Sequence, residues 1–354
     1  MENSILIILF FAYTFILGFL IHKYLISRSQ KYNIHKANTS AIRWEQQSKP
    51  IFGGITFFAL FIFAIINYIA FFDSSIIVSG PVIAIILSIT ISFLMGLADD
   101  LLNTPPLFKF GMQVSVAIIL IYFGIYINIF NNDTLNYLLT IFWVVGIMNS
   151  INMLDNMDGI TTSTSLVISI IIGVFALLSP SESVWFYLMI FSSVYAALGS
   201  FLIFNWNPSK MYMGDNGSQF LGAFLAIFGI MFLWNQNTPG YDHPALFKLV
   251  TVAIVFAMPL TDTITVSINR LLQGKSPFVG GKDHTTHHLS YAGFSDRKVA
   301  LVFIFGSLIS GIIAMVLIRY FPNPNITTLL LFFLYPVIVF SSLYTLTIIV
   351  KPNK

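Results

Sequence analysis

Residues 81–100 read PVIAIILSITISFLMGLADD, a long uncharged run that ends at two adjacent carboxylates, Asp99 and Asp100. An apolar run of this length is typical of a helix that crosses a membrane. A carboxylate beside a bilayer is costly and is usually retained for ion or substrate chemistry. The stretch therefore predicts a transmembrane helix with a chemically active end.

The composition extends this interpretation to the whole chain. Of the 354 residues, 57% are hydrophobic and 9% are charged, and the mean hydropathy is +0.86. A water-soluble fold cannot bury so much apolar surface, so the sequence predicts an all-α, polytopic integral membrane protein with one domain over residues 1–354. The net charge of +3 says little about partners, and no nucleic-acid partner is expected. The absence of cysteine excludes disulfides and thiolate metal sites.

About eleven transmembrane helices are predicted. They lie near 3–26, 51–72, 77–98, 107–129, 135–152, 160–178, 184–204, 218–236, 245–268, 299–320 and 327–349. In the first span the positive charges follow the apolar run and no small-residue cleavage site is evident, so a retained helix is expected rather than a signal peptide. Pro259 lies inside the ninth span and predicts a kink there.

The distribution of Lys and Arg predicts the orientation. With the N-terminus outside and the C-terminus cytoplasmic, all but two of the 17 basic residues fall on the cytoplasmic side, the exceptions being Lys248 and Arg319. The cytoplasmic loops are then expected near 27–50, 99–107, 152–160, 205–217 and 269–298, and together they form the predicted active face.

Three acidic motifs fall on this predicted cytoplasmic face. They read GLADD (96–100), NSINMLDNMDG (149–159) and MGDNGS (213–218), and their carboxylates are Asp99, Asp100, Asp155, Asp158 and Asp215. Five anions on one face repel one another unless a cation offsets them. Oxygen ligands suit Mg²⁺ or Mn²⁺, and Mg²⁺ usually adds substrate phosphate to one or two carboxylates. The motifs therefore predict a metal–phosphate site, to which Asn152 adds a neutral oxygen ligand.

Basic side chains that could bind phosphate lie on the same face; they include Lys49, Lys109, Arg270, Lys282, His284, His287 and His288. Gly214 and Gly217 predict a helix start whose free backbone N–H groups face an anion.

Several of these residues also have simpler interpretations. Lys109 could extend to the membrane interface, Asp155 and Asp158 could cap the following helix, and Asp262 could satisfy polar groups around Pro259. The histidines could form an exposed loop or a zinc site, although no further ligand spacing supports zinc.

Together these motifs resemble those of the polyprenyl-phosphate N-acetylhexosamine-1-phosphate transferases, a family related to phospho-N-acetylmuramoyl-pentapeptide transferase. The resemblance runs from Lys49 to the histidine loop. It implies Mg²⁺-dependent transfer of a HexNAc-1-phosphate, with GlcNAc-1-phosphate favoured, from a UDP-HexNAc to undecaprenyl phosphate in the bacterial inner (cytoplasmic) membrane. UMP would be released, and a lipid-linked cell-surface glycan would be started.

The resemblance also implies a role for each candidate residue. Asp215 and Asn152 are expected to bind the metal ion. Asp99, supported by Asp100, is expected to deprotonate or align the lipid phosphate. Near the donor nucleotide and diphosphate we expect Asp155 and Asp158. Phosphate or sugar contacts are expected from Lys49, Lys109, His284, His287 and His288.

Two positions depart from the family pattern. Asn156 stands where the family commonly has Gly, and the loop reads HTTHH (284–288), whereas many members have a tighter His-x-His-His. The second departure argues against the peptidoglycan branch, which remains the alternative within the family. A secondary transporter of an anionic solute is the alternative from another class, but transporters place key groups near the bilayer midplane. A homodimer is left open.

Overall fold

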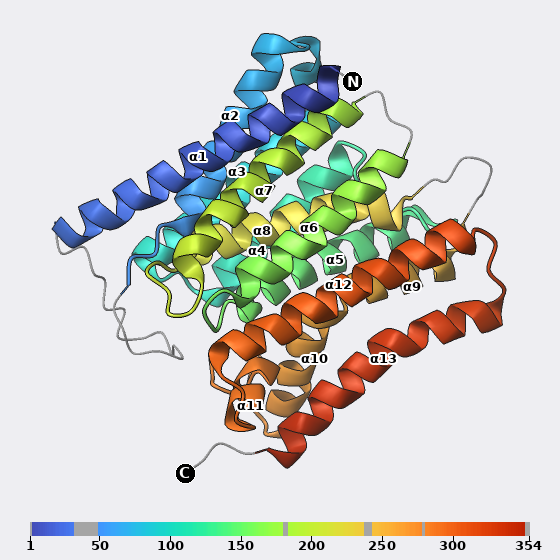
Figure 1. Ribbon diagram of the computed structural model, residues 1–354. Helices are drawn as coiled ribbons and strands as arrows, with labels where there is room; N and C mark the ends of the chain where they lie inside the picture. Colours follow the sequence, from blue (N-terminus) through green and yellow to red (C-terminus); the bar gives the residue numbers. More distant parts are fainter. Residues whose placement is uncertain (1, 32–48, 180–182, 237–242, 278–279, 351–354) are drawn as a thin grey trace.

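The computed structural model describes residues 2–31, 49–179, 183–236, 243–277 and 280–350 (Figure 1). These residues form helices and no strand. The helices are α1 (Glu2–Lys31), α2 (Gly53–Phe71), η1 (Ser75–Val78), α3 (Gly80–Leu102), α4 (Pro106–Tyr122), α5 (Asp133–Leu154), α6 (Ile160–Leu178), α7 (Val184–Asn205), α8 (Asp215–Gly229), η2 (Ile230–Trp234), α9 (Ala245–Val255), α10 (Ala257–Leu272), α11 (Thr285–Tyr291), α12 (Asp296–Tyr320) and α13 (Ile326–Ile349). The predicted loop near 27–50 lies outside the described residues over 32–48.

The all-α, polytopic prediction is confirmed. Within the described ranges, nine helical segments are long and apolar enough to cross a membrane, and α9 with α10 makes a tenth if the bent pair is one span. The span expected near 107–129 corresponds to α4, an apolar helix of 17 residues that ends at Tyr122. It ends early because Gly124, with φ of +85°, turns the chain out of the helix.

The kink expected at Pro259 is present but begins three residues earlier. The chain bends by 83° between α9 and α10, around Phe256. Pro259 is the third residue of α10, where its missing N–H costs little because the first helical turn has no intrahelical acceptor. Its carbonyl accepts a hydrogen bond from Ser150 Oγ of α5 at 3.0 Å.

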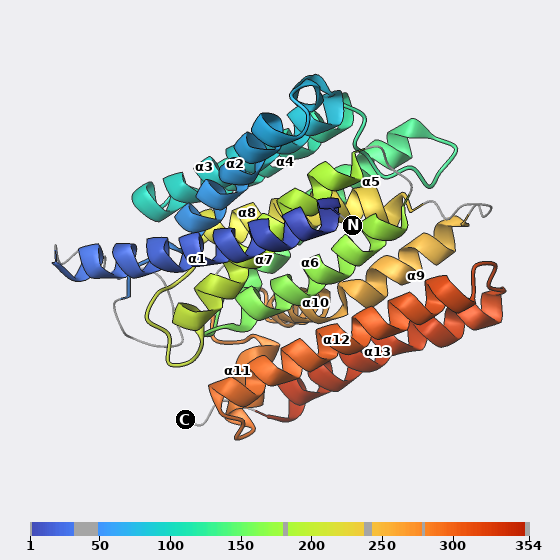
Figure 2. The ribbon, with the colours of Figure 1, turned by 45° about the horizontal axis from the view of Figure 1, so that its top comes forward.

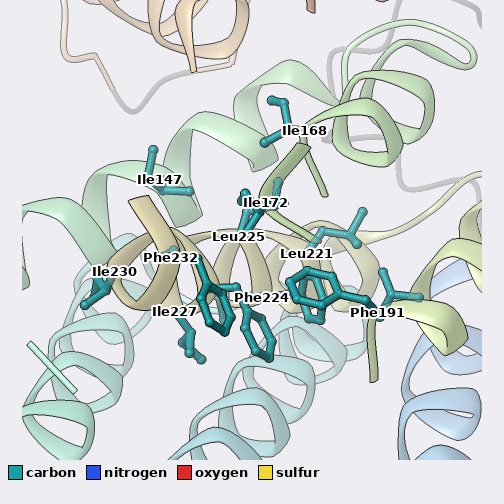
Figure 3. Packing of buried hydrophobic residues seen from close by; sticks show 14 of the residues in the cluster. Ile147, Ile168, Ile172, Phe191, Leu221, Phe224, Leu225, Ile227, Ile230 and Phe232 are labelled. Carbon is teal, nitrogen blue, oxygen red and sulfur yellow. The ribbon is translucent and has the colours of Figure 1, made fainter. Parts of the chain in front are cut away.

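Helix α8 forms the centre of the bundle (Figures 1 and 2). It packs against α3, α5, α2 and α6. In the most apolar stretch of Asp215–Trp234, the segment that α8 and η2 form together, 94% of the residues are buried. A helix that is apolar on every side is expected to be enclosed by others. Figure 3 shows this core, in which Phe224 and Phe232 lie beside Phe191 of α7, and Leu225 lies near Ile172 of α6.

The three acidic motifs come together at one end of this bundle, which we call the polar face. Helices α3 and α5 end there and α8 begins there, at the lower left of Figure 1, with α11 nearby. The N-terminus and the connection between α12 and α13 lie at the opposite end. Short connections between antiparallel helices therefore bring motifs far apart in the sequence to one surface.

Candidate active site

Three charged side chains from three different helices meet at the polar face. The ammonium group of Lys109 (α4) lies 2.7 Å from Asp99 Oδ2 (α3) and 3.5 Å from Asp215 Oδ2 (α8). Asp99 Oδ1 also accepts hydrogen bonds from the backbone N–H of Thr104, at 2.9 Å, and from its hydroxyl, at 2.6 Å. Lys109 thus offsets the repulsion between two carboxylates that would otherwise face each other.

Asn152, at the end of α5, joins this group. Its Nδ2 donates to Asp215 Oδ1 at 3.1 Å and to Ser218 Oγ at 2.8 Å. We call Asp99, Lys109, Asn152 and Asp215 the site cluster. The structure brings these four predicted residues together from four helices, and Lys109 makes an ion pair at the site instead of extending alone to the interface.

Asp100 binds the N-terminus of α8. Its carboxylate accepts hydrogen bonds from the backbone N–H of Asp215 at 3.0 Å and of Asn216 at 2.9 Å, and from the Asn216 side chain. The first N–H groups of a helix lack intrahelical partners and favour an anion. The N–H groups at this helix start face an anion, as expected, but that anion is the Asp100 carboxylate of the protein itself and not a phosphate.

Glycines allow α2, α3 and α8 to approach closely here. A Cβ on Gly54 would collide with the backbone of Gly217, and one on Gly96 would collide with the backbone of Asp215. The backbone N–H of Gly54 donates to the carbonyl of Met213 at 3.1 Å. The start of α8 is therefore held between two helices as well as by Asp100.

Asp158 binds the connection that leads into α8. Its carboxylate accepts from the Ser209 backbone N–H at 2.9 Å and hydroxyl at 2.7 Å, and Lys49 Nζ lies 3.8 Å away. Asp158 does not cap α6, because the N-cap residue is Gly159 and no side-chain hydrogen bond caps it. Asp155 is the half-buried C-cap residue of α5. Asp158 is thus placed to hold the connection that precedes Asp215.

The histidine loop is anchored by Asp262 of α10, whose role the sequence left open. Its fully buried carboxylate lies 2.8 Å from His284 Nδ1 and accepts from the Thr285 backbone N–H at 2.8 Å and hydroxyl at 2.6 Å.

Arg270 donates two hydrogen bonds to Asp283, at 2.8 and 2.7 Å. Burial favours a higher pKa for Asp283, but its hydrogen bonds with Arg270 lower the pKa below the ordinary value.

The two later histidines are held inside the loop. Burial lowers the pKa of His287 to about 3, and burial also lowers the pKa of His288. His288 Nδ1 lies 2.7 Å from the carbonyl oxygen of Val350, near the end of α13. These two side chains are therefore neutral at neutral pH, and His284 is the histidine joined to a buried carboxylate.

A contact between the two motifs that depart from the family pattern connects the histidine loop to α5. Thr286 Oγ1 donates to Asn156 Oδ1 at 2.7 Å. Asn156 lies four residues after Asn152, so the loop is joined to the helix end that carries part of the site cluster.

No group of three or more His, Cys, Asp or Glu side chains that could hold a metal ion occurs among the described residues. The ligand pair predicted from the sequence, Asp215 and Asn152, is smaller than such a group. It fits Mg²⁺, which often takes only one or two protein ligands and fills its other positions with water and phosphate oxygens. A site for zinc, which needs three or four protein ligands, is not formed by the described residues.

Comparisons with known proteins agree with this geometry. Residues 82–233, which contain the whole site cluster, match the model of glycosyl transferase family 4. The chain is 31% identical over 277 residues to the probable undecaprenyl-phosphate N-acetylglucosaminyl 1-phosphate transferase of Bacillus subtilis, a match that covers 76% of this chain and 73% of that protein. It is also 31% identical over 290 residues to the phospho-N-acetylmuramoyl-pentapeptide-transferase of Staphylococcus saprophyticus, covering 75% and 84%. The chain therefore belongs to glycosyl transferase family 4 and is a membrane enzyme of the polyprenyl-phosphate sugar-1-phosphate transferase type.

Proposed function

We propose that this enzyme transfers a HexNAc-1-phosphate, with GlcNAc-1-phosphate favoured, from a UDP-HexNAc to undecaprenyl phosphate. UMP is released, and the product starts a lipid-linked cell-surface glycan. The observation that carries the proposal is the meeting of Asp99, Lys109 and Asp215 at one end of a membrane bundle. The similarity to the probable undecaprenyl-phosphate N-acetylglucosaminyl 1-phosphate transferase of Bacillus subtilis supports the choice of GlcNAc.

The polar face is the cytoplasmic face of the bacterial inner membrane in this proposal, and the chain crosses the membrane eleven times with its N-terminus outside. The basic residues support this orientation. Of those that the structure describes, eleven lie on helices and loops at the polar face: Lys23, Arg28, Lys31, Lys49, Lys109, Lys210, Arg270, Lys275, Lys282, Arg297 and Lys298. Lys248 and Arg319 lie toward the other end.

The transfer is a displacement at the phosphorus that bears the sugar. An oxygen of the lipid phosphate forms a bond to this phosphorus, the bond from phosphorus to the bridging oxygen breaks, and UMP leaves with that oxygen. Such reactions depend mainly on positioning and on stabilising charge. Asp99, fixed by Lys109 and Thr104, is suited to align or deprotonate the lipid phosphate, which is already largely ionised at neutral pH.

Asp215 and Asn152 are the proposed ligands of Mg²⁺, with Mn²⁺ as the alternative ion. The bound ion would neutralise the negative charge that grows on the leaving UMP. Asn152 presents its amide nitrogen to Asp215 here, and a half-turn of the amide group presents its oxygen instead.

The donor nucleotide is proposed to lie beside the site cluster, near Asp155, Asp158 and Lys49. His284, oriented by Asp262, is proposed to contact the donor phosphate or sugar. His287 and His288 are proposed to support the loop, since both are buried and neutral.

A second candidate donor is UDP-N-acetylmuramoyl-pentapeptide. The similarity to the Staphylococcus saprophyticus transferase favours it, because that match covers 84% of the relative. Both donors carry the same diphosphate, so the site cluster serves either one.

The test is UMP release by the purified protein with undecaprenyl phosphate and Mg²⁺. UDP-GlcNAc, UDP-GalNAc and UDP-N-acetylmuramoyl-pentapeptide are compared, with and without the lipid. We expect lipid-dependent UMP release with UDP-GlcNAc and loss of that activity in EDTA. If no donor gives UMP when the lipid is present, the proposed function is wrong.

Asp215→Ala tests the metal assignment, with Asp73→Ala as its matched control because Asp73 is an exposed carboxylate between α2 and η1. Asp215→Ala is expected to remain folded without turnover, and Asp73→Ala to keep full turnover. Normal activity of Asp215→Ala would remove Asp215 from the metal site.

A further inference from the structure

A layer of three amide side chains, two buried and one half-buried, lies beneath the site cluster. Gln113 (α4) and Asn149 (α5) exchange hydrogen bonds in both directions: Asn149 Nδ2 donates to Gln113 Oε1 at 2.8 Å, and Gln113 Nε2 donates to Asn149 Oδ1 at 3.4 Å. Gln113 Nε2 also donates to Gln219 Oε1 (α8) at 3.1 Å. We call these three residues the amide triad.

Each member of the amide triad lies one helical turn from a member of the site cluster. Gln113 follows Lys109 by four residues in α4, and Gln219 follows Asp215 by four residues in α8. Residues four apart lie on the same side of a helix.

The third pair runs the other way along the chain. Asn149 precedes Asn152 by three residues, and α5 runs toward the polar face whereas α4 and α8 start from it. All three amides therefore lie on the membrane side of their partners, by about 5 Å along each helix axis.

The triad connects helices whose relative position determines the site. Helix α4 packs along α3 and α5, and long side chains join it to α8. Lys109 contacts Asp215 of α8, and Gln113 contacts Gln219 of α8 one helical turn further into the bundle. A rotation or shift of α4 relative to α8 would break both of these contacts together.

Burial makes the triad selective for one arrangement. Gln113 and Gln219 are each only 1% exposed. A buried amide that loses its partner is left unsatisfied, and in a membrane protein this disfavours the unpaired arrangement by a modest amount. The amides therefore favour the register in which the three of them meet, which is also the register in which the site cluster forms.

We propose that Gln113, Asn149 and Gln219 are positioning residues for phosphoryl transfer, which hold Lys109, Asn152 and Asp215 in their mutual geometry. The inference rests on the proposed roles of those three residues. Interhelical hydrogen bonds between amides add only modestly to membrane-protein stability. A purely structural triad would therefore change the folded fraction slightly and leave the kinetics of the folded enzyme unchanged.

The experiment compares Gln113→Met and Gln219→Met with the wild type, because Met keeps the length of the side chain and removes its hydrogen bonds. Tyr195→Phe is the matched control, since it removes a part-buried interhelical hydrogen bond, from Tyr195 Oη to the Ser169 carbonyl at 2.9 Å, outside the site. UMP release is measured per folded enzyme against Mg²⁺ and against each substrate.

We expect kcat to fall between about tenfold and a hundredfold in both Met variants, since small misplacements of reacting groups have effects of this size. The Mg²⁺ concentration for half-maximal activity should rise several-fold, and the melting temperature should shift no more than in Tyr195→Phe. The double variant should lose little more kcat than either single variant, because the triad acts as one unit.

Unchanged kcat and Mg²⁺ dependence in folded Gln113→Met would overturn the proposal, as would an equal loss in Tyr195→Phe. If Gln113→Met does not fold, Gln113→Asn, which keeps a shorter amide, is expected to show the same kinetic pattern to a smaller degree; wild-type kinetics in Gln113→Asn would also overturn it. Failure of the proposed function is distinguishable, because the wild type itself would then release no UMP.

Discussion

The carboxylate of Asp100 at the end of α3 accepts a hydrogen bond from the backbone N–H of Asp215, the first residue of α8, at 3.0 Å. One of two adjacent aspartates thus belongs to the framework, and the other, Asp99, pairs with Lys109. Adjacent residues of a helix point in directions about 100° apart, so one dipeptide serves both purposes. The position of Asp215 therefore depends on α3.

Replacing Asp100 by Asn should lower both stability and turnover. The amide keeps one acceptor oxygen but loses the charge that favours a helix N-terminus, so the free energy of unfolding should fall by about 1–2 kcal/mol. Turnover should fall further, because the start of α8 carries Asp215. Thermal unfolding and UMP release measure the two effects. Asp133→Asn, at the exposed start of α5 on the other end, is the control: it removes the same kind of charge from a helix N-terminus, so it should cost at most about 1 kcal/mol of stability and leave turnover unchanged. Wild-type turnover in Asp100→Asn would contradict this account.

Gly96→Ala tests the close approach of α3 and α8. The added Cβ would overlap the backbone of Asp215 and Asn216, and overpacking of this kind costs about 1–3 kcal/mol. The melting temperature and turnover should therefore both fall. Gly111→Ala is the matched control in α4, where a Cβ meets no atom within 4 Å and Ala is the better helix former, so this variant should be as stable as the wild type or more so. If Gly96→Ala has the same melting temperature and turnover as Gly111→Ala, then α3 and α8 are not in close contact at Gly96.

The sequence predicted the membrane class and the shared location of the acidic motifs because both depend on local patterns. Apolar runs determine the helices, and helix ends determine which motifs share a face. Asp99, Lys109, Asn152 and Asp215 could therefore be grouped without a structure. Their individual roles remain predictions.

Tertiary contacts account for what the sequence did not predict. At the helix start between Gly214 and Gly217, the N–H groups of Asp215 and Asn216 donate to Asp100, a contact that depends on how α3 approaches α8. Asp262 lies 22 residues from His284, and only the bend at Phe256 brings α10 to the histidine loop. Gln113 and Gln219 were not predicted as site residues, because neither carries a local sequence signal for its partner.

Asp262→Asn should weaken binding of the nucleotide sugar more than binding of the lipid. Asp262 fixes the His284 ring and the start of α11, and an amide can accept at only one of its two terminal atoms. The KM for UDP-GlcNAc should rise about tenfold, since a hydrogen bond to a charged group contributes about 1.5–3 kcal/mol. The KM for undecaprenyl phosphate should change little. Thr285→Val, which removes only the hydroxyl contact, should show a smaller rise. Equal changes in both KM values would argue against a donor-specific role for the loop.

Acidification should destabilise the protein through His287. Burial lowers the pKa of His287 to about 3 in the folded protein, whereas an unfolded histidine has a pKa of about 6.5. Between these values the unfolded chain binds more protons, so stability is complete above about pH 7 and is lost as the pH falls toward 3. At about pH 5.5, His287 should have lowered the free energy of unfolding by roughly 1 kcal/mol relative to its value above pH 7. The lowered pKa of His288 acts in the same direction.

Thermal unfolding of the wild type and of His287→Gln at about pH 7.5 and pH 5.5 measures this dependence. Glutamine is neutral at both values, so the variant should lose less stability than the wild type on acidification, whatever its stability at the higher pH. Asn269→Gln, at the end of α10, is the control, because it changes no titratable group and should keep the full dependence. An identical loss in the wild type and in His287→Gln would contradict the lowered pKa, because His287 would then take up its proton equally well in the folded and unfolded states.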